Sequence, residues 1–165
     1  RTYTKEHFHS MADTIREIMP NCGLSTDIIV GFPGETEKHF EETLDLMEKI
    51  KFNSAFTFKY SPRPYTKAEQ FTDQIDETIK KERLDKLMNL QKKHTLELNS
   101  KKIGQVENVL IEKESKKSSN HWAGRTDSNQ WVILEKNSSK IKDIIPVEII
   151  DATGVVLHGK EIVRA

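Results

Sequence analysis

The chain has 165 residues, of which 35% are hydrophobic, with a mean hydropathy of −0.65 and a formal net charge of zero. This length suffices for one medium domain or two small ones, and no apolar run is long enough to span a bilayer. The single cysteine, Cys22, excludes an internal disulfide framework and fits a reducing, cytoplasmic setting. His7 and His9 are two positions apart, but the sequence offers no further cysteine or histidine pair at zinc-binding spacing, so it predicts no metal site.

The helices and strands alternate in the N-terminal part of the chain. Apolar residues at helical spacing predict helices at 4–19 and 37–50, and β-branched or alternating residues predict strands at 28–30 and 54–60. Short connections between them predict parallel strands, and the run at 28–30 is expected to be buried on both faces. Because two strands are too few for a stable sheet, we expect this part to end a larger α/β domain.

A glycine-rich turn follows the first of these strands. Gly31, Pro33 and Gly34 allow a tight turn, and Thr36 is expected to be the N-cap of the next helix. A strand, a glycine-rich turn and a helix N-terminus in succession place a ligand at the carboxyl end of a sheet. An ordinary βα turn remains the alternative. The proline-bounded loop at 61–66 is expected at the same edge.

The remaining chain predicts one long helix and then a small barrel. The helix at 76–102 is expected to start at Asp76 and to bury a narrow seam that includes Leu87 and Met88, with lysines on the opposite face. Residues 80–102 carry eight Lys/Arg against three Asp/Glu, which predicts either an anionic partner or a solvated face. After Gly104 the apolar period becomes two, and strands are expected near 105–113, 121–127, 129–135, 145–151 and 155–163. Five short strands predict a closed or nearly closed barrel of the OB kind, so the fold class is α/β followed by all-β.

Two short strings resemble a known family. Residues 26–36, TDIIVGFPGET, resemble the radical-SAM methylthiotransferases, and residues 58–64, FKYSPRP, most resemble the MiaB-type branch, which methylthiolates isopentenyladenosine next to the tRNA anticodon. The end of the chain, with GRTD at 124–127, is similar to a TRAM domain, the small RNA-binding module of these enzymes. The resemblance implies three regions: the C-terminal portion of a radical-SAM, TIM-type barrel at 1–75, a connecting helix at 76–103 and a TRAM β-barrel at 104–165.

The resemblance implies an activity that belongs to a longer protein. The family uses S-adenosylmethionine and two [4Fe-4S] clusters, one of them on a CxxxCxxC motif that this chain lacks. The chain alone is therefore expected to hold no cofactor and to catalyse nothing, and to depend on an N-terminal part of the same protein. The implied partner is the tRNA anticodon stem-loop, with no membrane contact. The alternative from a different class is a stand-alone RNA-binding or adaptor protein without catalysis, and a nucleotide-binding α/β protein is a third.

The resemblance also implies two groups of site residues. Candidate cofactor-binding residues are Asp27, Ile29, Gly31 and Tyr60, of which Ile29 and Gly31 match a family pattern beside the adenine of S-adenosylmethionine. Candidate RNA-binding residues are Arg63, Lys116, Lys117, Trp122 and Arg125, which supply phosphate contacts or base stacking. Structural roles stay open for these residues, such as a strand-end carboxylate for Asp27 and a surface arginine for Arg63.

Three further residues complete the expectations from the sequence. Of the two tryptophans, Trp131 is expected in the barrel core, because Val132, Ile133 and Leu134 follow it. Glu35 lies one position beyond the place of the glutamate in the family pattern. Tyr65 stands where related enzymes usually have glycine.

Overall fold

The computed structural model describes residues 4–162, and the chain divides into two compact units. The first unit contains Leu24–Lys92 together with the start of the first helix, and the second contains Ile15–Gly23 together with the residues from Lys93 onwards. The helices are α1 (Lys5–Ile18), α2 (Glu37–Ile50) and α3 (Glu77–Ser100), with a short 3-10 helix at Lys67–Gln70. No helix in the described part of the chain has the length and apolarity needed to cross a bilayer.

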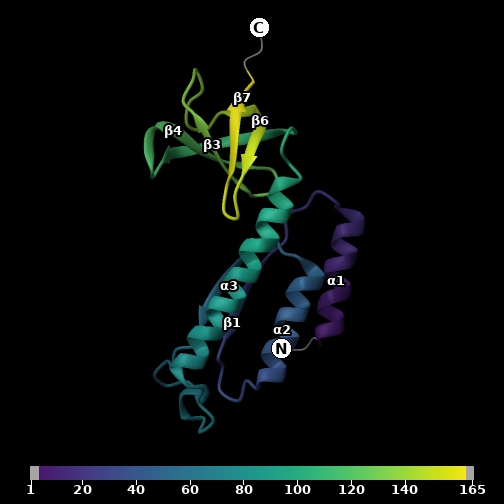
Figure 1. The fold of residues 1–165 in the computed structure, drawn as a ribbon, viewed down its shortest axis with the longest axis vertical. Helices are drawn as coiled ribbons and strands as arrows, with labels where there is room; N and C mark the ends of the chain where they lie inside the picture. The colour runs from purple at the N-terminus through teal and green to yellow at the C-terminus, as the bar shows by residue number, and fades with distance from the viewer. Residues whose placement is uncertain (1–3, 163–165) are drawn as a thin grey trace. The chain divides into compact units, whose positions relative to one another are not determined.

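The first unit contains a two-stranded parallel sheet. Strand β1 (Ser25–Val30) pairs with β2 (Ser54–Lys59) over its full length, with Ser25 opposite Ser54 and Val30 opposite Lys59. Residues of α1, α2 and α3 bury the apolar side chains of one sheet face, and Figure 1 shows the three helices beside the strands. The predicted parallel arrangement of the βα repeat is therefore confirmed.

The opposite face of this sheet has no covering layer among residues 4–162. Side chains of β1 and β2 alternate between the two faces, so Ile28 and Val30 enter the core while Ile29 is 56% exposed. On β2, Phe56 and Phe58 are 64% and 52% exposed. The expectation that residues 28–30 are buried on both faces is wrong for this chain, because the helices cover only one face.

The turn after β1 has the backbone that its glycines predict. Gly31 and Gly34 have φ values of 73° and 79°, in the left-handed region that favours glycine. The predicted N-cap of α2 is confirmed, because the Thr36 hydroxyl accepts a hydrogen bond from the His39 amide at 3.2 Å. In return, Nδ1 of His39 accepts from the Thr36 amide at 3.4 Å, which completes a capping box.

Helix α3 starts as predicted but buries more than its apolar seam. The Asp76 carboxylate accepts a hydrogen bond from the Thr78 amide at 2.7 Å, and Leu87 is fully buried. Met88, expected in the seam, is 38% exposed. Lys80, expected on the solvent face, is only 3% exposed, and Arg83 is buried with it. The two cations turn inward because they meet partners from the glycine-rich turn and from the start of α3.

The second unit contains the predicted closed barrel. Its strands are β3 (Val106–Ser115), β4 (Ser118–Thr126), β5 (Trp131–Glu135), β6 (Ile144–Ala152) and β7 (Leu157–Glu161). They close in the order β3-β4-β5-β7-β6, and only the β5–β7 pair is parallel. The barrel occupies the green-to-yellow part of the ribbon in Figure 1. Seven side chains fill its core: Val109, Ile111, Val132, Leu134, Val147, Ile149 and Leu157.

Candidate functional site

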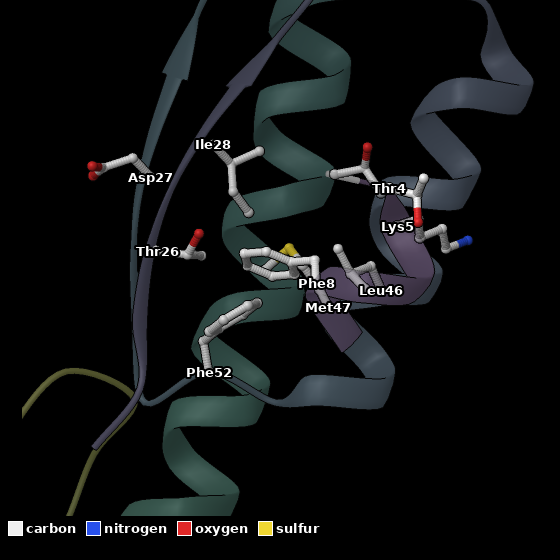
Figure 2. Close-up of a pocket in the computed structure, with 10 residues that line it drawn as sticks. Thr4, Lys5, Phe8, Thr26, Asp27, Ile28, Leu46, Met47 and Phe52 are labelled. Atoms are coloured by element: carbon white, nitrogen blue, oxygen red, sulfur yellow. The ribbon is translucent and has the colours of Figure 1, made fainter. Parts of the chain in front are cut away.

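The four residues proposed for cofactor binding divide between two places in the first unit. Asp27 and Ile29 lie on the uncovered face of the β1-β2 sheet, and both are exposed. Figure 2 shows Asp27 pointing away from the helices, while Ile28 points toward them. Gly31 and Tyr60 are buried instead. The structure therefore brings only two of the four residues to one open surface.

Lys80 of α3 covers both Gly31 and Tyr60. A Cβ atom built on Gly31 would lie 2.3 Å from Cγ of Lys80, so the lysine stem fills the space above the glycine. The Lys80 ammonium lies 5.5 Å from the centre of the Tyr60 ring and 2.8 Å from a carboxylate oxygen of Glu77. Lys59 donates to the same carboxylate at 2.7 Å, and these two hydrogen bonds lower the pKa of Glu77 to about 2.

A buried ion pair fixes the glycine-rich turn. The Glu35 carboxylate accepts a hydrogen bond from the Gly31 amide at 2.6 Å and another from the Arg83 guanidinium at 2.8 Å. Arg83 also donates to the backbone carbonyl of Glu35 at 2.9 Å and to the Glu37 carboxylate at 3.0 Å. This contact gives Glu35 a structural role in the turn. Nothing in the sequence pattern singled out Arg83, which lies 48 residues away.

A small cavity lies beside β1, in the first unit. Its volume is about 210 Å³. Figure 2 shows Phe8, Met47 and Phe52 gathered around it. Half of its lining residues are apolar, three of the others are threonines, and Lys5 and Asp27 are the two ionisable residues in that lining. It is therefore a packing gap between α1, α2 and β1.

Arg63 lies in the exposed loop after β2. Its backbone carbonyl accepts hydrogen bonds from the Thr66 amide at 3.2 Å and from the Thr66 hydroxyl at 2.8 Å, and these bonds close the loop. Tyr65 has a φ of 69°, and its side chain is fully exposed. The left-handed backbone accounts for the glycine expected at this position, because glycine adopts it without steric cost.

The barrel carries a groove on its outer surface, with a volume of about 750 Å³. Lys116 and Lys117 form the turn between β3 and β4 at its rim. The lining residues are Lys113, Ser115, Lys116, Lys117, Ser118, His121, Ala123, Trp131, Ile133, Thr153, Val155, Val156 and His158. None of them is acidic, although residues 103–165 contain nine Asp/Glu as well as nine Lys/Arg. We call this feature the basic groove.

The two tryptophans lie in the opposite places to those expected. Trp131 lines the basic groove, and Trp122 packs against the barrel core. The register explains this result, because Trp122 pairs with the buried Leu134, whereas Trp131 pairs with Arg125 on the outer face. The expectation that Trp131 is the core tryptophan is therefore wrong. The alternation of side chains along β5 places Val132 and Leu134 in the core and so places Trp131 on the outer face.

Arg125 is held beside the groove and does not line it. Its guanidinium lies 4.3 Å from the Trp131 ring centre, and Lys113 lies 4.5 Å from the same ring. Arg125 also donates a hydrogen bond to the side-chain carbonyl of Asn129 at 2.5 Å and lies 3.4 Å from a Glu112 oxygen. Its position thus orients the indole.

Among residues 4–162 no group of three His, Cys, Asp or Glu side chains is arranged to hold a metal ion.

Comparison with known proteins gives two findings. A family model described as TRAM domain matches residues 100–162. The tRNA-2-methylthio-N(6)-dimethylallyladenosine synthase of Christiangramia forsetii is 43% identical over 163 residues, which are 98% of this chain and 34% of that protein. Proteins of the same name from Methylacidiphilum infernorum and Thermoanaerobacter sp. are 41% and 42% identical, each across 99% of this chain. The chain spans about a third of the length of the curated relatives it matches.

Proposed function

This chain belongs to the family of MiaB-type tRNA methylthiotransferases and carries their TRAM domain, and from this premise we propose that it acts as the C-terminal, tRNA-contacting part of such an enzyme. The complete protein would transfer a methylthio group to an adenosine next to the tRNA anticodon, in the cytoplasm. Its partner would be the anticodon stem-loop. The observation that carries the proposal is the basic groove, which lies on the domain that matches the TRAM model.

The first unit would complete a TIM-type barrel in the longer protein. Two observations support this proposal: the strands are parallel, as in a βα barrel, and the sheet face away from the helices exposes Ile29, Phe56 and Phe58 with no cover among residues 4–162. In such a barrel the uncovered face would point inward. Asp27 and Ile29 would then face the barrel interior together with Phe56 and Phe58.

The cofactors of the proposed activity fit this chain only in part. Asp27 and Ile29 fit a position against S-adenosylmethionine, because both lie on the open face and offer a carboxylate and an apolar contact. Gly31 and Tyr60 do not fit, because Lys80 occupies the space above them. The iron–sulfur clusters, which supply the radical chemistry of the family, would be held by other parts of the protein, since this chain has one cysteine.

A tRNA titration at several salt concentrations tests the proposed function. We expect the chain to bind unmodified tRNA saturably, with an affinity that falls as salt rises. Replacing Lys116 and Lys117 by alanine should remove two phosphate contacts and reduce the slope of log K against log salt by roughly 1.4 to 1.8. Lys160→Ala is the matched control, because Lys160 is an exposed barrel lysine outside the groove. Absence of saturable binding, or equal loss in the control, would contradict the proposal.

A further inference from the structure

We propose that the basic groove seats one unpaired nucleotide of single-stranded RNA, with the base against its apolar floor and the phosphate toward its lysines. This inference rests on the proposed function and adds the class of RNA that the site accepts. The volume of about 750 Å³ lies in the range of small-ligand pockets, roughly 300 to 1,000 Å³. The groove is therefore large enough for a base to enter rather than only touch the surface.

The floor of the groove comes from neighbouring barrel strands. Ala123 of β4 pairs with Ile133 of β5, and Ile133 pairs with His158 of β7, so these three residues form one row across the outer face. Val155, from the turn between β6 and β7, adds an aliphatic wall and is 69% exposed. Ala123, Ile133 and Val155 offer apolar surface to the flat face of a base and no hydrogen-bond donor from their side chains to a phosphate.

Trp131 supplies the aromatic wall. Lys113 and Arg125 both contact its ring, with both cations within 4.5 Å of the ring centre. Cation–π contacts of this kind fix the plane of an indole before a ligand arrives. Stacking of one base on an aromatic side chain typically changes affinity by about 5- to 100-fold.

The charges of the groove favour a phosphate beside the seated base. Lys113, Lys116 and Lys117 line it, and no carboxylate does. Phosphate contacts alone would favour duplex RNA, because a duplex has the higher charge density. A seated base reverses this preference, because the bases of a duplex are stacked and paired and so cannot enter the groove. The relative affinity for single strands and duplexes therefore separates the two modes of binding.

The first test measures binding of an eight-nucleotide uridine or adenosine single strand and of a blunt RNA duplex of the same length (about eight pairs), at equal salt. We expect the single strand to bind at least about 5-fold more tightly and to quench tryptophan fluorescence. The quenching should persist in a Trp122→Phe variant, which leaves Trp131 as the only tryptophan of the chain. Equal or tighter binding of the duplex would overturn the proposal.

The second test uses groove variants with matched controls. Trp131→Ala should weaken single-strand binding by about 5- to 100-fold, and Trp131→Phe should recover part of the loss. Val155→Ser, at an exposed position that should not affect folding, should weaken it by about 3-fold. The control is Ile150→Ser, at another exposed apolar position on β6 outside the groove, which should leave single-strand binding unchanged.

The outcomes separate this inference from the proposed function. If Trp131→Ala and Val155→Ser leave single-strand binding unchanged while Lys116 and Lys117 still control tRNA binding, then the base-seating inference is overturned and the tRNA-contacting role stands. If the chain does not bind tRNA, and if none of these substitutions changes single-strand binding, both the base-seating inference and the tRNA-contacting role are overturned.

Discussion

Replacing Arg83 by methionine tests whether the glycine-rich turn depends on a buried ion pair. Methionine keeps an unbranched stem and removes the guanidinium, together with its charge, its hydrogen bonds and its contact with Phe40, whose ring centre lies 5.4 Å from Cζ of Arg83. The Arg83 side chain is 7% exposed and that of Glu35 is 12% exposed. The variant therefore leaves the Glu35 carboxylate largely buried, and it keeps the hydrogen bond from the Gly31 amide.

The magnitude follows from how deeply each partner is buried. Removing one partner of a buried pair costs about 3 to 5 kcal/mol, because the other charge is left uncompensated. The contact with Glu37 adds less than about 1 kcal/mol, because that carboxylate is 59% exposed. We expect a loss near 3 kcal/mol for Arg83→Met. A double variant that also carries Glu35→Gln should be more stable than the single one, because it leaves no buried charge and keeps an acceptor for the Gly31 amide.

Urea unfolding followed by two probes measures this effect. Both tryptophans lie in the barrel, so fluorescence reports the second unit, whereas far-ultraviolet circular dichroism reports mainly the helices. Arg83→Met should lower the midpoint of the dichroism transition and leave the fluorescence transition in place. A loss below about 1 kcal/mol, or an equal shift of both transitions, would refute the role given to this ion pair.

Four further substitutions test other parts of the first unit. Since the pKa of Glu77 is lowered from 4.5 to about 2, its contribution to stability is present above pH 4.5 and is lost as the pH falls toward 2. In acid unfolding, Glu77→Gln should remove the part of the pH dependence of stability that comes from this carboxylate. Gly31→Ala should destabilise by about 2 kcal/mol or more, since its Cβ meets the Lys80 stem, and Gly34→Ala by less, since its Cβ meets only a movable carboxylate. Tyr65→Gly should stabilise by up to about 1 kcal/mol in the same urea assay, because it relieves a left-handed residue that packs on nothing.

Local signals in the sequence predicted the elements and much of their arrangement. The caps at Thr36 and Asp76 were visible because a cap depends on a few consecutive residues. The parallel pairing of β1 and β2 followed from alternation with helices, and the closed barrel followed from five short strands joined by polar turns. These features need no knowledge of which distant residues meet.

The features that sequence reasoning missed all depend on distant contacts. Lys80 and Arg83 look like solvent-facing cations of a helix. Their burial becomes favourable because Arg83 pairs with the distant Glu35, and because Lys80 pairs with Glu77 and packs on the ring of the distant Tyr60. The roles of the tryptophans depend on strand register, since a shift of one residue exchanges inside and outside. The basic groove joins the β3–β4 hairpin, β5 and the β6–β7 turn, which are separate in sequence. Only Lys116, Lys117 and their neighbours near β4 gave a sequence signal.

Hydrogen exchange of the chain with and without tRNA tests the central claim most directly. If the basic groove is the tRNA contact, amides of 113–121, 131–133 and 153–158 should become protected together when tRNA is added, and Lys116→Ala with Lys117→Ala should weaken this protection. Protection that appears only on the lysine-rich part of α3, with the three groove segments unchanged, would contradict the account.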